Sequence, residues 1–270
     1  MILITGSDGF IGKNLSNRFY NKGIYFSEIR TCFDDLYEGI NWEEIEEIWH
    51  MGAISSTTET DLDKIYRYNI KYTLELFNYA IEYQIPIKYA SSASVYGNSP
   101  HYNRNINPLN YYAMSKATID KWVEDNINKF SKIHGYRFFN VYGAFEDHKG
   151  KQASPVHTFS KQAKETGKIK LFENSVAYMR DFIWVEDVID CMYYDSHSSG
   201  IYDVGTGVAR SFQRVAEIVA NKYNAEIEYI PFPEHLKDKY QYYTCARNHF
   251  IEKKFTSIEE YLLLPEVQSF

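Results

Sequence analysis

Two adjacent tyrosines precede a lysine in the stretch NPLNYYAMSK, residues 107–116. On a helix, residues four apart differ by only about 40° around the axis, so Tyr112 and Lys116 share a face while Tyr111 points elsewhere. An ammonium group beside a phenol lowers the pKa of the phenol from about 10, which lets it act as an acid or a base near neutral pH. The spacing therefore predicts a proton-transfer pair in which Tyr112 is the reacting group.

The position of this pair matters more than its spacing, because a Tyr-x-x-x-Lys match arises easily by chance in a chain with 25 tyrosines. The pair follows the run IPIKYASS, which we expect to form a strand that ends at Ser91 and Ser92. Open α/β sheets bind ligands at the carboxyl ends of their strands. A serine at that edge, followed by Tyr112 and Lys116, forms a coherent catalytic set.

A glycine-rich loop near the start of the chain, TGSDGFIG, carries Gly6, Gly9 and Gly12. It follows the apolar run MILIT and precedes a stretch with helical spacing, so it predicts a turn whose backbone approaches the pyrophosphate of a dinucleotide. Arg30 stands about where such folds place an acid that binds the adenosine ribose. A guanidinium there suits a 2′-phosphate and favours NADP, whereas Glu28 as the ribose ligand would keep NAD possible.

The elements that must position these residues alternate between strand and helix. This pattern predicts an α/β fold, a doubly wound parallel-sheet Rossmann domain with a smaller C-terminal substrate-binding lobe. We expect the dinucleotide-binding domain over residues 1–141, with the chain returning to it around 180–204, and the substrate lobe mainly over 142–270. The expected helices include one capped by Asp61, with Ile65, Tyr68, Tyr72 and Leu76 on one face, one over about 111–129, and one from Ser154-Pro155 to Gly167.

Composition excludes several classes of function. The chain has 270 residues, 44% of them hydrophobic, and a net charge of −7, so no global basic field favours nucleic acid or an anionic membrane. No run of about eighteen apolar residues predicts a membrane span, and no leader precedes MILITG, so we expect a cytoplasmic protein. Three scattered cysteines and eight histidines without paired spacing predict no metal site, and His50 is expected to be a core histidine.

Many ordered motifs add a resemblance to a known family. The stretches HMGAISSTTETD, YASSASVYG, RFFNVYG, DHKGKQAS, LFENS, RDF, GIYDVGTG and IEYIPFPEHLKDKYQ span the chain to about residue 245. Together they resemble the ADP-L-glycero-D-manno-heptose 6-epimerases, a family of the extended short-chain dehydrogenase/reductases. The resemblance implies inversion of carbon 6 of an ADP-heptose through a transient ketone, in a homo-oligomer, within carbohydrate metabolism. It leaves open whether the product feeds lipopolysaccharide or another glycan.

Such an inversion needs two acid/base residues, because the ketone must turn over before the hydride returns to its opposite face. The resemblance places them at Tyr112 and Lys149, gives Ser92 a hydrogen bond to the reacting oxygen, and lets Lys116 hold the nicotinamide ribose. Besides the glycines, Arg30 and Lys116, the cofactor residues that it implies are Phe10, Ile11, Met51, Gly52, Ala53, Ile54, Ser55, Asn69 and Val141. For the substrate it implies Ser92, Asn140, Lys151, Phe172, Glu173, Asn174, Ser175, Arg180 and Tyr240.

Departures from the family pattern put the cofactor and the sugar in doubt. The segment between the second strand and HMGA is shortened, Lys151 stands where the family has serine, and changes occur at 144, 145, 157 and 158. Another nucleotide-sugar epimerase or reductase therefore stays an alternative, and so does a non-catalytic dinucleotide-binding module. A sugar dehydratase is disfavoured because the serine position lacks the neighbouring Asp-Glu pair.

Overall fold

The computed structural model describes residues 1–31, 39–99, 105–233, 241–247 and 254–265. The chain divides into two compact units. Unit 1 comprises Met1–Gly97, Ile106–Arg137 and Met192–Tyr202, and unit 2 comprises Asn98–Asn105, Phe138–Cys191 and Asp203–Phe270. None of the helices within the described ranges has the length and the apolar character that crossing a bilayer requires.

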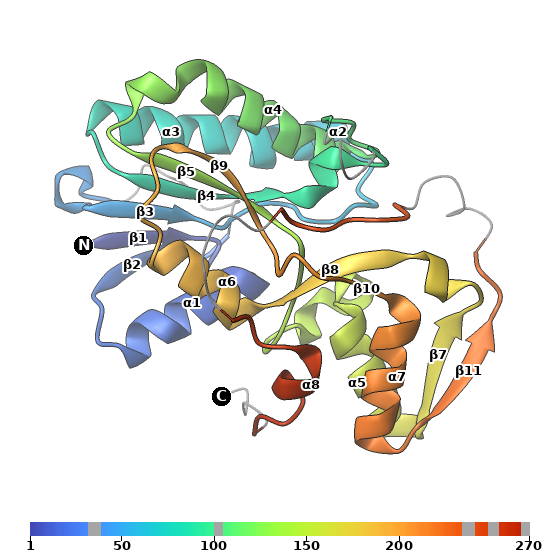
Figure 1. Ribbon diagram of the computed structural model, residues 1–270. Coiled ribbons are helices and arrows are strands. Elements are labelled where there is room, and N and C mark those ends of the chain that lie inside the picture. Colours follow the sequence, from blue (N-terminus) through green and yellow to red (C-terminus); the bar gives the residue numbers. More distant parts are fainter. Residues whose placement is uncertain (32–38, 100–104, 234–240, 248–253, 266–270) are drawn as a thin grey trace. The chain divides into compact units, whose positions relative to one another are not determined.

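Unit 1 is built on a six-stranded sheet in the order β2-β1-β3-β4-β5-β9 (Figure 1). Its strands are β1 (Ile2–Thr5), β2 (Phe26–Ile29), β3 (Glu47–His50), β4 (Ile87–Ser92), β5 (Ile133–Phe138) and β9 (Gly200–Val204). The pairs β1–β2, β1–β3 and β3–β4 are parallel, which confirms the predicted doubly wound sheet. The chain leaves β1 toward β2 and later returns to β3 on the other side of β1, so a ligand-binding switch point lies between β1 and β3.

Helices cover both faces of this sheet, with α1 on one face and α3 and α4 on the other (Figure 1). The helical elements are α1 (Phe10–Asn21), η1 (Trp42–Glu44), α2 (Leu62–Ile65), η2 (Tyr66–Lys71), α3 (Tyr72–Glu82), η3 (Ala93–Tyr96), α4 (Tyr111–Asn126) and η4 (Ile127–Lys129). The side chains of Asp61 and Asn110 cap α2 and α4 by accepting hydrogen bonds from backbone N–H groups.

The helix predicted after Asp61 is interrupted by a turn of π-helix, η2. A π-turn holds an extra residue and rotates the following face, which periodicity of 3.6 does not anticipate. Ile65 and Leu76 are buried as predicted, and the π-turn adds the buried side chain of Asn69 between them. Asn69 forms hydrogen bonds within the candidate site described below.

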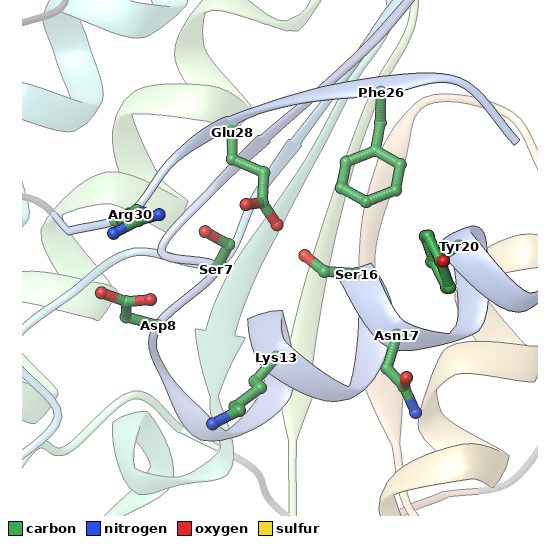
Figure 2. Close-up of a pocket in the computed structure, with 9 residues that line it drawn as sticks. All are labelled: Ser7, Asp8, Lys13, Ser16, Asn17, Tyr20, Phe26, Glu28 and Arg30. Atoms are coloured by element: carbon green, nitrogen blue, oxygen red, sulfur yellow. The ribbon is translucent and has the colours of Figure 1, made fainter. Parts of the chain in front are cut away.

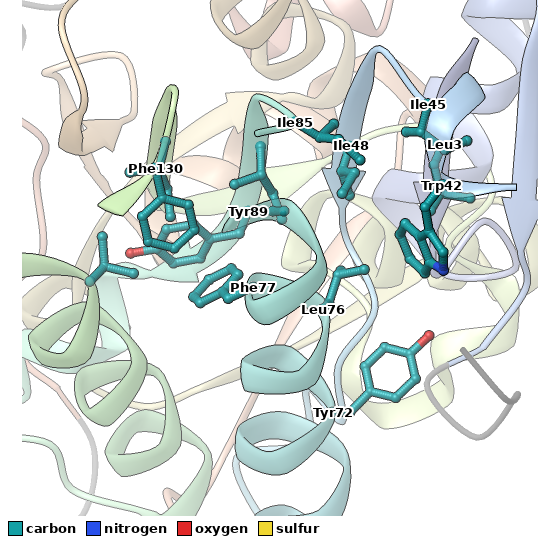
Figure 3. Packing of buried hydrophobic residues seen from close by; sticks show 14 of the residues in the cluster. Leu3, Trp42, Ile45, Ile48, Tyr72, Leu76, Phe77, Ile85, Tyr89 and Phe130 are labelled. Atoms are coloured by element: carbon teal, nitrogen blue, oxygen red, sulfur yellow. The ribbon is translucent and has the colours of Figure 1, made fainter. Parts of the chain in front are cut away.

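The core of unit 1 lies between the sheet and α3, α4 and η1 (Figure 3). Leu76 and Phe77 of α3 are fully buried, and the Phe77 ring meets that of Phe130 edge to face at 5.5 Å between centroids. Trp42 stacks on Tyr79 at 4.2 Å. Large rings of this kind contribute more than their buried area alone, so they fix how the helices sit on the strands that carry the site.

The buried carboxylate of Asp195 links two segments of unit 1. The Asp195 carboxylate accepts hydrogen bonds from Tyr136 at 2.7 Å and from His197 at 2.8 Å, and it pairs with His134 at 2.8 Å. Burial opposes the charged form, but these hydrogen bonds outweigh it and hold the pKa of Asp195 well below its usual range. The acid thereby attaches the 192–199 segment to β5.

Unit 2 holds two smaller sheets, β10-β8-β6 and β11-β7. Its elements are β6 (Asn140–Tyr142), η5 (Asp147–Gln152), α5 (Pro155–Thr166), β7 (Lys168–Phe172), η6 (Ser175–Ala177), β8 (Met179–Trp184), α6 (Val185–Tyr193), β10 (Ala209–Ser211), α7 (Phe212–Tyr223), β11 (Glu226–Ile230) and α8 (Ile258–Tyr261). Ser154 caps α5 with Pro155 in its first turn, and Gly167 ends it in the left-handed conformation, as predicted.

The division of the chain differs from the predicted one in two places. Unit 1 ends at Arg137, before the expected boundary at 141, because β6 pairs with β8 of unit 2. The return expected around 180–204 begins only at Met192, since β8 lies at the centre of the β10-β8-β6 sheet. Sequence periodicity identifies such strands but does not say which sheet each one joins.

Candidate active site

The glycine loop lies at the switch point of the sheet, and steric constraints explain two of its glycines. Gly6 has φ of +75°, and a Cβ on it would lie 2.4 Å from the Cα of Gly52. A Cβ on Gly12 would lie 2.1 Å from the carbonyl oxygen of Gly6. Gly9 is the N-cap of α1 and provides no side-chain cap, so the start of this helix faces the loop with backbone groups. This is the backbone cradle that a pyrophosphate requires.

A cavity of about 430 Å³ opens beside this loop, between α1 and β2 (Figure 2). It is lined by Ser7, Asp8, Lys13, Ser16, Asn17, Tyr20, Phe26, Glu28 and Arg30. The hydroxyls of Ser7 and Ser16 are buried and have no hydrogen-bond partner within the described part of the chain. Buried hydroxyls normally have a partner, so the cavity suits a polar ligand. The Arg30 carbonyl accepts from the N–H of Asp8 at 3.1 Å, which fixes Arg30 next to the glycine loop.

The residues of this unit fit a dinucleotide, because the loop, the start of α1 and the polar cavity are contiguous in the chain and in space. Every predicted cofactor residue except Val141 lies in unit 1. These are Gly6, Gly9, Phe10, Ile11, Gly12, Arg30, Met51, Gly52, Ala53, Ile54, Ser55, Asn69 and Lys116. Lys13 in the cavity is an addition that the sequence did not indicate, since a lysine on the first turn of a helix reads as a solvated surface residue.

The predicted cofactor segment Met51–Ser55 is irregular and is held by Asn69 from the π-turn. Asn69 accepts from the Ile54 N–H at 2.8 Å and donates to the Ile54 carbonyl at 2.9 Å. It also donates to the Ser115 hydroxyl at 3.0 Å, and Ser115 donates to the Tyr112 carbonyl at 2.7 Å. One buried amide therefore ties the segment after β3 to the first turn of α4.

His50, at the end of β3, confirms the prediction of a core histidine. It lies 2.6 Å from the Thr5 hydroxyl and 2.9 Å from that of Thr73, and is almost fully buried. Burial and the nearby charge of Lys116 lower its pKa to about 3, so the imidazole is neutral at physiological pH. His50 thus joins β1, β3 and α3 beneath the switch point.

Ser92, Tyr112 and Lys116 come together at the carboxyl end of β4, as the sequence predicts for neighbours on one helix face above a strand end. The Ser92 side chain lies near the Tyr112 phenol and opposes the rise of its pKa. The Ser92 hydroxyl also accepts from the Ser94 N–H at 3.2 Å, which orients it. Lys116 is buried, and its ammonium donates to the carbonyl of Ala90 at 2.7 Å. The group places two hydroxyls and one cation at the edge where such sheets bind ligands.

The predicted effect of Lys116 on Tyr112 is wrong for this structure. Desolvation raises the pKa of Tyr112, the Ser92 side chain opposes this rise, and the negative charge of Asp120 adds to it. The Lys116 ammonium is directed to the Ala90 carbonyl instead. Tyr112 is therefore a neutral phenol that can donate a proton, and it needs further positive charge nearby before it can accept one.

Asp120 is a functional candidate that the sequence analysis missed. Its carboxylate accepts from Tyr89 at 3.0 Å, from Ser91 at 2.9 Å and from Arg137 at 2.7 Å. Arg137 also donates to the Tyr96 hydroxyl at 3.0 Å. This buried network fixes α4 against the ends of β4 and β5. A signal was present in the sequence, because Asp120 follows Lys116 by four residues and so lies on its face of α4.

Unit 2 carries the predicted second acid/base, Lys149, on the short helix η5. Its ammonium lies 3.3 Å from the carboxylate of Glu146, which is fully buried. Lys151 is exposed beyond a kink at Gly150, while Asn140 and Val141 lie on β6 and pair with Phe182 and Ile183 of β8. Lys149 lies in unit 2, whereas Tyr112 lies in unit 1.

The predicted substrate residues Phe172, Glu173, Asn174 and Ser175 follow one another at the end of β7. Phe172 is 36% exposed, Asn174 adopts the left-handed conformation with φ of 60°, and Ser175 donates to the Phe172 carbonyl. This tight turn presents the exposed edge of Phe172 together with Glu173 and Asn174.

Arg180 is buried on β8 and holds backbone rather than an acid. It donates to the carbonyls of Met179 and Gln241, and its guanidinium lies 5.6 Å from the centre of the Phe212 ring. The neighbouring carboxylate of Asp181 accepts hydrogen bonds from Thr206, Gly207 and Ala246. Tyr240 lies outside the described residues.

Each unit carries residues suited to acid/base chemistry, and unit 1 also holds the glycine loop. No group of three or more His, Cys, Asp or Glu side chains within the described ranges could hold a metal ion. Unit 1 offers a phenol with a serine beside it, and unit 2 offers an ammonium paired with a buried carboxylate. Such groups move protons to and from a hydroxyl or a carbonyl oxygen.

Comparisons with known proteins agree with this chemistry. Residues 2–205 match the model of the NAD dependent epimerase/dehydratase family. An ADP-L-glycero-D-manno-heptose-6-epimerase from Alkalilimnicola ehrlichii is 39% identical, covering 91% of this chain and 88% of its own. The solved ADP-L-glycero-D-manno-heptose-6-epimerase of Helicobacter pylori has a TM-score of 0.82 and 26% identity, covering 97% of this chain and 93% of its own. The Thermus thermophilus UDP-glucose 4-epimerase solved with NAD has a TM-score of 0.75 at 21% identity, covering 91% and 89%, which shows a shared fold.

Proposed function

The chain belongs to the NAD dependent epimerase/dehydratase family, and from that premise we propose that it is a nucleotide-sugar epimerase that inverts carbon 6 of an ADP-heptose. The observation that carries the chemistry is the placement of Ser92, Tyr112 and Lys116 at the carboxyl end of β4, in the unit that holds the glycine loop. The choice of sugar is supported by the Alkalilimnicola ehrlichii relative, which carries that name and matches 91% of this chain.

The residues of unit 1 serve the oxidation step. A bound nicotinamide would accept the hydride that leaves carbon 6 and return it later, and its charged ring adds the positive field that Tyr112 requires. As the C–H bond breaks, Tyr112 takes the proton of the substrate hydroxyl, so the carbon becomes a ketone. Ser92, which lies beside Tyr112, donates to the same oxygen. Lys116 would hold the ribose of the bound cofactor.

A second acid/base residue completes the inversion. The ketone must turn over before its other face receives the hydride, and a single fixed group is badly placed for one of the two orientations. We assign that second role to Lys149, whose ammonium is partly exposed on η5 in unit 2. In one direction Tyr112 takes the first proton and Lys149 gives the second, and in the other direction the roles exchange.

For the cofactor we propose NADP. Arg30 and Lys13 line the cavity beside the glycine loop, and the buried Ser7 hydroxyl lacks a partner among the residues described. Two cations and a hydroxyl suit a ribose 2′-phosphate. Glu28 lines the same cavity and would instead accept from a free ribose hydroxyl, as NAD requires.

Mass analysis of the cofactor released on denaturation decides between these cofactors. We expect the mass of NADP, and we expect Arg30→Ala to weaken NADP binding by about tenfold or more, the worth of one charge-assisted hydrogen bond, with little effect on NAD. Release of NAD overturns the assignment, and so does an equal loss of affinity for NADP and NAD in Arg30→Ala.

The reaction is tested by incubating the protein with each ADP-heptose epimer separately in deuterated water and following carbon 6 by NMR. We expect both epimers to reach the same mixture without deuterium on carbon 6, because the hydride that leaves is the one that returns. Tyr112→Phe and Lys149→Met should abolish inversion. Matched controls are Tyr111→Phe, a 37% exposed neighbour, and Lys161→Met, an exposed lysine of the same unit. Deuterium at carbon 6 refutes the mechanism, and inversion of other nucleotide sugars alone refutes the substrate.

A further inference from the structure

The carboxylate of Glu146 is the most completely enclosed acid near the proposed second acid/base residue. Its residue is fully buried and lies between β6 and α5. One oxygen accepts from the Gly143 N–H at 3.1 Å and from the Ser154 hydroxyl at 2.7 Å. The other accepts from the Ser154 N–H at 2.6 Å and from the Lys149 ammonium at 3.3 Å. One carboxylate therefore joins both ends of the 143–154 segment to Lys149.

The backbone and hydroxyl donors do not explain why a charged group stands here. A neutral oxygen can accept from Gly143 and Ser154, and burying a carboxylate costs far more than burying a neutral acceptor. All four hydrogen bonds are stronger to a charged oxygen than to a neutral one, but only Lys149 among the four partners carries a positive charge that compensates it. The negative charge of Glu146 is thus matched to Lys149, while its other hydrogen bonds fix where that charge lies.

Geometry also excludes Glu146 as a proton donor or acceptor for the substrate. Both of its oxygens are taken up by N–H groups, and its side chain is 0% exposed, whereas the Lys149 side chain is 21% exposed. A substrate or a water molecule therefore reaches Lys149 first. Glu146 can act only through the position and the charge of its neighbour.

We propose that Glu146 is a positioning residue that holds the Lys149 side chain in one place between successive proton transfers. This inference rests on the proposed function, in which Lys149 is the second acid/base. In the direction in which Lys149 donates, the N–H bond breaks, the proton passes to the substrate oxygen as the hydride reaches carbon, and Lys149 is left as a neutral amine. It must regain a proton from water before the next turnover, and the fixed carboxylate keeps the amine in place meanwhile.

The test uses single turnovers of each ADP-heptose epimer on the cofactor-loaded protein, followed by the absorbance of the reduced nicotinamide. One epimer is oxidised with Lys149 as the base and the other with Tyr112. We expect Glu146→Gln to slow oxidation of the first epimer by about tenfold to a hundredfold, the effect of a displaced catalytic group, and to leave the second nearly unchanged. Ser154→Ala is the matched control, because it removes a hydrogen bond to the same carboxylate but keeps the charge.

A second readout does not depend on catalysis. An amine-reactive label is applied at neutral pH, and modification of Lys149 is quantified by mass spectrometry of its peptide. We expect faster labelling in Glu146→Gln than in the wild type and no such change in Ser154→Ala, since the amine loses its anionic partner only in the former. If Glu146→Gln does not fold, Glu146→Asp, which draws the charge back by one methylene, is expected to show the same asymmetry between epimers.

Three outcomes are separable. Equal slowing of both epimers in Glu146→Gln and Ser154→Ala, with unchanged labelling, makes Glu146 a structural clamp and overturns this inference alone. If Lys149→Met oxidises both epimers at the wild-type rate, the two-residue mechanism itself fails and this inference fails with it. Selective slowing of the same epimer in Lys149→Met and Glu146→Gln supports both.

Discussion

Replacing Asp120 with asparagine should make the fold less stable and should make Tyr112 a proton acceptor at lower pH. The carboxylate is buried on α4 and pairs with Arg137 at 2.7 Å, with side-chain exposures of 2% and 13%. The substitution keeps the shape of the side chain and removes only its charge. Arg137 is then left in the interior without its anion, while Tyr112 on the same helix loses a negative neighbour.

The size of the first effect follows from burial. Removing one partner of a buried ion pair costs about 3–5 kcal/mol, because the remaining charge is uncompensated. The asparagine oxygen can still accept one hydrogen bond, so we expect about 3 kcal/mol, which lowers the melting temperature by roughly 10 °C. The second effect has the opposite sign: since the charge of Asp120 raises the pKa of Tyr112, removing it lowers that pKa.

Two measurements test this prediction, a thermal unfolding curve and the pH dependence of oxidation of the epimer that uses Tyr112 as its base. We expect a less stable protein whose ascending limb of rate against pH moves to lower pH. The control is Asp125→Asn on the exposed side of α4, where water screens the pair with Lys121 and its loss should change the stability little. A limb that stays in place or moves to higher pH, with the stability loss present, refutes the electrostatic assignment.

Three further predictions concern unit 1. Asn69→Ala removes both hydrogen bonds to the backbone of Ile54 and should cost about 2–4 kcal/mol, with a loss of cofactor affinity in titration that exceeds the loss of stability. Gly12→Ala should abolish cofactor retention, because its Cβ would lie 2.1 Å from a carbonyl oxygen, whereas Gly23→Ala meets nothing within 4 Å and should cost only about 1–2 kcal/mol for its positive φ. Asp195→Asn should flatten acid denaturation: a depressed pKa stabilises the fold above about pH 4 and is lost as the pH falls further, so the variant is less stable at neutral pH but less sensitive to acid.

Features fixed by local chain chemistry were predictable from the sequence. Asp61 and Asn110 cap their helices, and Ser154 with Gly167 bounds α5, because each acts on backbone groups within a few residues. The glycine loop and the shared face of Tyr112 and Lys116 follow from steric freedom and helical pitch in the same way. These signals were sufficient to predict the doubly wound sheet and the group at the end of β4.

Features that depend on distant partners were not predictable. The π-turn at Asn69 changes the register of its helix so that one amide reaches both Ile54 and Ser115, and these lie 15 and 46 residues away. The direction of the Lys116 ammonium toward Ala90, 26 residues before it, likewise depends on how α4 lies on β4. Since the pKa of Tyr112 follows from that packing, helical spacing alone gave the wrong sign for its shift.

The two buried acids, Asp120 and Glu146, show that contacts which the sequence does not predict also bear on function. Each lies within one or two helical turns of a residue assigned to proton transfer, yet neither is exposed to a substrate. A buried acid destabilises the fold unless it is paired, so its presence indicates a nearby cation. Asp120 pairs with Arg137, whose side chain is 13% exposed, and Glu146 pairs with Lys149, whose side chain is 21% exposed. Arg137 also donates to Tyr96 and so belongs to a buried network, whereas Lys149 lies on a polar turn, which is why we place Glu146 rather than Asp120 behind a reacting group.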